Sequence, residues 1–99
     1  MAEDRKSYQQ KMEERLRRLG ARIDELLKEV EVRAREEYRR LSETLPQKLK
    51  KAQEELERLK AAGDEAWTEF RPGLEHAWTD VKDAWEKASE RFRRRREEE

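Results

Sequence analysis

The chain has 99 residues, of which 51% are charged and 33% hydrophobic, and its 25 Lys and Arg residues balance its 25 Asp and Glu residues. An ordinary globular domain is roughly 25% charged and 45–50% apolar, so this composition excludes a domain with a thick core and leaves disordered chains or long helices with a narrow apolar stripe. The zero net charge favours helices, because disordered polyelectrolytes usually carry an excess of one sign.

The first predicted element is a long helix over residues 4–61. Its apolar residues begin at Tyr8 and follow one another in steps of three and four, and the same phase continues to Phe92. The average step is about 3.65 residues, close to the 3.67 of an 11-residue (hendecad) repeat and above the 3.5 of a heptad coiled coil. Pro46 predicts a kink rather than a new helix, since a start there would place lysines at a helix N-terminus.

A turn is predicted at residues 62–64. Arg58 and Lys60 suit the last turn of a helix, Gly63 suits a left-handed position after it, and Asp64 suits the cap of the next helix. Pro46 and the Arg-Pro-Gly sequence at 71–73 are the other candidate breaks, so the main turn lies near 46, 63 or 72.

The second predicted helix covers residues 65–94 and is distorted at 71–73. Residues 95–99 should fray, because they place acids at a helix C-terminus. This helix folds back on the first as a hairpin and leaves the apolar stripe of residues 8–30 uncovered. We therefore expect a second chain to cover it, in a homo-oligomer that is a dimer or a small bundle.

Tryptophan recurs in the second helix in a regular pattern. The sequence Ala66-Trp67-Thr68-Glu69 is repeated eleven residues later as Ala77-Trp78-Thr79-Asp80, and Trp85 follows after seven more. Eleven residues are three helical turns, so these rings share one face. They are interpreted as anchors of a helix–helix seam. The alternatives are a membrane-interface helix or a contact with a protein partner.

Residues that could carry catalysis or bind a metal are scarce. His76 is the only histidine, and a carboxylate-bridged metal site would need an acid at position 73, where Gly73 stands. There is no cysteine and no glycine-rich phosphate loop. We predict a protein that is not an enzyme and has no metal or cofactor.

Targeting and nucleic-acid signals are also missing. The polar N-terminus lacks a signal-peptide core, and no apolar run approaches the ~20 residues of a membrane span. The one basic run, Arg93–Arg96, is followed at once by Glu97–Glu99, and balanced charge argues against nucleic acid as the main partner. A cytoplasmic location is expected.

A set of residues spread over most of the chain is shared with a known family: Tyr8, Tyr38, Ala66-Trp67, Gly73-Leu74-Glu75, Ala77-Trp78, Ala84-Trp85 and Ser89-Glu90-Arg91-Phe92. In these residues the sequence resembles small bacterial coiled-coil proteins described as stress-response proteins. The resemblance implies a cytoplasmic helical protein tied to stress, with no catalytic residues to transfer. The 11-residue period is also similar to that of apolipoproteins, as an analogy of pattern only.

These observations predict an all-α protein of long amphipathic helices, a helical hairpin or coiled coil assembled into an oligomeric bundle. We expect a non-enzymatic structural or interaction protein that self-associates and is linked to stress response; the alternative is a peripheral membrane or lipid-binding protein. The predicted core or oligomer interface consists of Leu16, Leu19, Ile23, Leu26, Val30, Tyr38, Leu41, Leu45, Leu49, Leu56, Leu59, Trp67, Phe70, Leu74, Trp78, Val81, Trp85 and Phe92.

Overall fold

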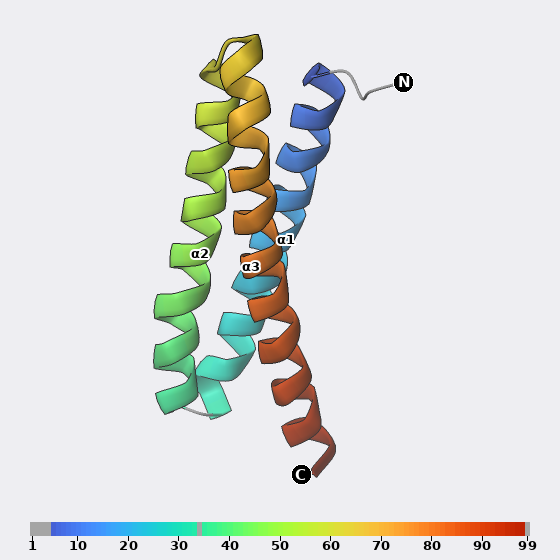
Figure 1. Ribbon diagram of the computed structural model, residues 1–99. Coiled ribbons are helices and arrows are strands. Elements are labelled where there is room, and N and C mark those ends of the chain that lie inside the picture. Colours follow the sequence, from blue (N-terminus) through green and yellow to red (C-terminus); the bar gives the residue numbers. More distant parts are fainter. Residues whose placement is uncertain (1–4, 34, 99) are drawn as a thin grey trace.

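The computed structural model describes residues 5–33 and 35–98, which form three helices packed as a bundle (Figure 1). They are α1 (Arg5–Arg33), α2 (Arg35–Ala61) and α3 (Asp64–Glu98). α2 runs antiparallel to the other two, so α1 and α3 are parallel. The molecule measures 52 × 24 × 16 Å, and the 35 residues of α3 span roughly its whole length at about 1.5 Å per residue. The prediction of an all-α helical hairpin bundle is confirmed.

The first helix differs from the prediction. Instead of one helix over residues 4–61, α1 ends at Arg33 and α2 begins at Arg35, and the two helices pack side by side. Position 34 lies outside the described residues. Folding α1 back onto α2 buries the stripe that a single long helix would leave in water, and this burial is the main favourable term in folding.

The link between α2 and α3 consists of Ala62 and Gly63, within the predicted turn. Its chemistry differs from the prediction, because no described glycine has a positive φ. The carbonyl of Gly63 instead accepts a bond from the Trp67 N–H at 2.7 Å, so Gly63 is the N-cap of α3. Asp64 and Glu65 then occupy the first turn of α3, where the helix dipole favours acids.

Both prolines lie inside helices rather than at breaks. α2 continues through Pro46 and α3 through Pro72, and both rings are exposed on the outside of the bundle. α3 also continues past the predicted end at 94 and through the tail that was predicted to fray, as far as Glu98; Glu99 lies outside the described residues.

One continuous core follows the bundle axis, and it contains no buried polar or charged side chain among the described residues. Of the predicted core residues, Phe70 is 37% exposed and the side chain of Val30 lies outside the described set. Partly buried at the edge of the core are Tyr38, Leu41, Leu49, Trp78 and Trp85. Fully within it are Leu16, Leu19, Ile23, Leu26, Leu45, Leu56, Leu59, Trp67, Leu74, Val81 and Phe92, joined by Tyr8, Met12, Ala52, Ala77 and Ala88.

The stripe on α1 is therefore buried within its own chain. Tyr8, Met12 and Ile23 are 5%, 2% and 1% exposed. A second chain is not needed to cover residues 8–26, so the argument that predicted an oligomer from an uncovered stripe loses its basis.

Candidate functional site

The candidate site is the seam between α1 and α3, where the aromatic side chains of the sequence meet cations. α1 and α3 lie farther apart than the other two helix pairs, and tryptophans of α3 fill the space. Trp67 contacts Tyr8 near one end of the seam, and Trp85 lies beneath the Arg22 guanidinium farther along, with the carbon at its centre 5.6 Å from the ring centroid.

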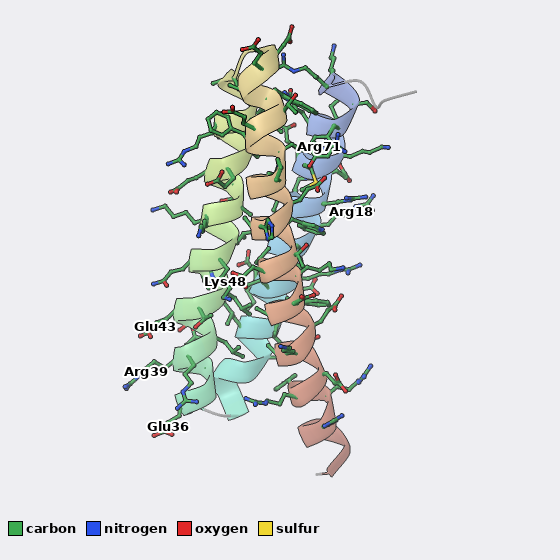
Figure 2. All side chains as sticks on the ribbon, viewed as in Figure 1. Arg18, Glu36, Arg39, Glu43, Lys48 and Arg71 are labelled. Carbon is green, nitrogen blue, oxygen red and sulfur yellow. The ribbon has the colours of Figure 1, made fainter. Side chains whose placement is uncertain are left out.

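Five side chains form what we call the link-end cluster, beside the Ala62–Gly63 link: Arg5, Tyr8, Trp67, Arg71 and Glu75. The rings of Tyr8 and Trp67 meet edge to face, with centroids 5.5 Å apart and an interplanar angle of 73°. The Arg71 guanidinium lies 4.3 Å from the Tyr8 centroid and 5.6 Å from that of Trp67, and Figure 2 labels it between α1 and α3. Each cation–ring contact contributes about 0.5–1 kcal/mol at a partly exposed site.

Glu75 completes this cluster from one turn along α3. Its Oε1 accepts hydrogen bonds from the Tyr8 hydroxyl at 3.2 Å and from Arg71 Nε at 3.3 Å. Burial, followed by the nearby charge of Glu75, raises the pKa of Tyr8 above its ordinary value of 10.0. Tyr8 therefore remains a neutral hydrogen-bond donor at physiological pH, a role that orients side chains rather than activating a nucleophile.

Arg5 ties the start of α1 to the link. Its Nη1 donates to Asp64 Oδ1 at 2.6 Å, its Nη2 donates to the carbonyl of Ala62 at 2.7 Å, and its guanidinium lies 5.5 Å from the Trp67 centroid. The ion pair between Lys60 and Glu13 joins α2 to α1 at the same end. All three helices are thus connected here by charged groups.

Two indole N–H groups in the seam are buried without a hydrogen-bond partner in the described part of the chain, Trp67 Nε1 and Trp85 Nε1. A buried indole N–H usually finds an acceptor, and leaving one unsatisfied costs about 1–3 kcal/mol. Opening the seam would return both groups to water. Among the described side chains, both buried polar atoms without a hydrogen-bond partner therefore lie in the α1–α3 seam.

The structure brings together some of the residues that the sequence singled out. Trp67 is a seam anchor as predicted, but its partners Arg5, Tyr8 and Arg71 belong to the same chain. The spacing Trp67, Arg71, Glu75 at i, i+4, i+8 was a usable signal for one face of α3. The pairing with Tyr8 was not predictable from it, since that pairing depends on the reversal between α1 and α2.

No set of three or more metal-binding side chains converges within the described ranges, and none of the three helices as described combines the length and apolar character needed to cross a membrane. The resemblance to stress-response coiled-coil proteins stays a prediction. Comparisons with models of protein families, with curated proteins and with solved structures found no match.

Proposed function

We propose that this protein is a non-enzymatic interaction protein that self-associates by exchanging α1 between copies. The observation that carries the proposal is the burial of the whole described apolar face of α1 against the hairpin of α2 and α3. A second copy offers the same surface, so an exchanged α1 would re-form the same contacts, including the link-end cluster. Exchange of an identical element is a low-cost route to a closed symmetric dimer.

The connection between α1 and α2 supports this exchange. Only one position separates the two helices, and short hinge loops favour domain swapping. The sequence across the hinge, residues 30–37, reads Val-Glu-Val-Arg-Ala-Arg-Glu-Glu and contains no glycine or proline. In a helix that continued through this hinge, Glu31 and Arg35 would stand at i, i+4, the spacing of a favourable ion pair. Such a helix would project α1 away from its own hairpin and onto that of a partner.

Light scattering on a sizing column tests the proposal after the protein has been unfolded and refolded over a wide range of concentrations. We expect a dimer whose fraction rises with the concentration at refolding. An insertion of Gly-Gly-Ser between Arg33 and Ala34 should shift the population to monomer, because a longer hinge makes it easier for α1 to fold back on its own chain. The same insertion between Ala62 and Gly63 is the matched control and should leave the dimer unchanged. A monomer at every concentration in the unmodified chain would overturn the proposal.

A lipid surface is the second candidate partner, favoured by the two unsatisfied indole N–H groups. Tryptophan suits the boundary between apolar and wet surroundings, and opening the seam would place Trp67, Trp85 and the basic Arg5 and Arg22 on one amphipathic surface. Because Trp67 is already buried in the free protein, co-sedimentation with anionic vesicles is a clearer assay than an emission shift. Binding to anionic but not zwitterionic vesicles supports this candidate, and no sedimentation with either removes it. A role in stress response rests on the sequence resemblance alone.

A further inference from the structure

A groove of about 300 Å³ lies between α2 and α3, toward the end of the bundle remote from the Ala62–Gly63 link. In Figure 1 the ribbons of the two helices lie close together at the link and farther apart at this end. The described apolar residues that line the groove, which we call the floor, are Leu41, Leu45, Ala84, Ala88 and Phe92. Its described polar residues, which we call the rim, are Arg40, Thr44, Lys87 and Arg91.

The groove follows from the side chains that meet there. α3 presents two alanines one turn apart, Ala84 and Ala88, to the groove. α2 presents Leu41 and Leu45 opposite them at the same spacing. Leu45 is fully buried and Ala88 is 8% exposed, so the floor belongs to the core, but methyl side chains are too short to fill the space between the helices.

The charge of the rim has one sign. The described lining includes three cations and no acid. Within the described part of the chain, Arg40, Lys87 and Arg91 form no ion pair, whereas Lys48, farther along α2, is paired with Asp80 at 2.8 Å. Figure 2 labels two acids near this end of α2, Glu36 and Glu43, and both point away from α3.

We propose that this groove binds one medium-chain fatty acid. The carboxylate would be held by the three rim cations, since hydrogen bonds between a cationic side chain and a carboxylate are roughly twice as strong as those between neutral groups. The alkyl chain would cover the apolar floor. A volume of about 300 Å³ is at the lower limit of small-molecule sites, which suits a single chain rather than a two-chain lipid. The groove lies within one α2–α3 hairpin, so binding is independent of any exchange of α1.

Isothermal titration calorimetry with dodecanoate below its micelle concentration tests this site. We expect saturable binding of one dodecanoate per chain, at least tenfold tighter than that of dodecyltrimethylammonium, which has the same tail and the opposite charge. Equal affinity for the two amphiphiles, or binding of dodecanoate only above its micelle concentration, would overturn the proposal.

Two variants separate the floor from the rim. Ala88→Leu should fill the groove and weaken dodecanoate binding at least tenfold, with Ala84→Leu as a second variant if the first melts at a lower temperature. Arg91→Gln should weaken binding about fivefold to tenfold. The control Arg94→Gln removes the same charge from an exposed residue of α3 that does not line the groove, and it should change affinity less than twofold. Equal losses for Arg91→Gln and Arg94→Gln would show attraction by net charge alone and overturn the assigned site.

Discussion

The two ends of the bundle use the same kinds of residue in opposite ways. At the link end, the cations Arg5 and Arg71 lie against the rings of Tyr8 and Trp67 and reach acids as well. At the groove end, three cations without ion pairs in the described chain surround an apolar space. The difference shows that a highly charged composition says little about function until the fold decides which charges are paired. The link end holds the helices together, and the groove end is available for a ligand.

The largest effect that separates the two ends should come from removing an aromatic ring at each. Trp67 and Phe92 are both 7% exposed, yet Trp67 is enclosed by Arg5, Tyr8 and Arg71, whereas Phe92 borders the groove. Trp67→Ala should lower the free energy of unfolding by about 3–5 kcal/mol and Phe92→Ala by less than about 3 kcal/mol, because part of its surroundings is already empty.

Urea unfolding followed by circular dichroism measures both losses. If Trp67→Ala does not fold, Trp67→Leu provides a smaller truncation at the same position. Equal losses for the two alanine variants would mean that the groove does not lower the cost of truncating Phe92.

A smaller difference should separate two arginines. Arg5→Ala removes an ion pair, a bond to the Ala62 carbonyl and a cation–ring contact, and its half-exposed position limits the loss to about 1–2 kcal/mol. Arg91→Ala should change stability by less than about 0.5 kcal/mol, as surface substitutions without partners do. Thermal melts of the two variants give the comparison, and a loss at Arg91 as large as that at Arg5 would show that the rim has a structural role.

The smallest effect concerns pH and belongs to the link end alone. The pKa of Tyr8 is raised by burial and by Glu75. From about pH 10 upward, the unfolded chain therefore loses this proton while the folded chain retains it, and stability falls as pH rises through this window. Lys60, whose pKa is raised by its bond to Glu13, adds to the fall in the same direction. Tyr8→Phe should make the fall between pH 9 and about 11 shallower while leaving the Lys60 contribution. An unchanged slope in urea unfolding at these pH values would argue against a buried Tyr8.

Helical propensity and the apolar period were enough to predict the all-α fold and most of the core. Both are properties of short stretches of chain. The glycine that marks the α2–α3 link is a local signal of the same kind. The reversal between Arg33 and Arg35 has no such local signal, because Ala34 and its neighbours favour helix. It follows from contacts between residues far apart in the sequence, such as Tyr8 with Glu75. The spacing of the apolar residues did not indicate the reversal either. The breaks between the helices are so short that the steps of three and four residues continue across them.

The candidate site was predictable only in part, for the same reason. The tryptophans could be assigned to a helix–helix seam from their spacing. Which helix lies across that seam depends on the reversal between α1 and α2. The spacing left open whether Trp67 belongs to the core or to an oligomer interface, and in the structure it contacts α1 of its own chain. The groove could not be predicted at all, because Ala84 and Ala88 leave a space only where α2 and α3 diverge.

The parallel arrangement of α1 and α3 also bears on the order in which the molecule folds. α2 and α3 are joined by two residues and tied by contacts such as Lys48–Asp80, 32 positions apart. The bonds of α1 to the link and to α3 span 57 to 67 positions. Since closing a longer loop costs more entropy before contacts form, we expect the two hairpins of sequence neighbours, α1 with α2 and α2 with α3, to form before the α1–α3 seam. The closing of this seam would then be the last step of folding, and its opening the first step of unfolding.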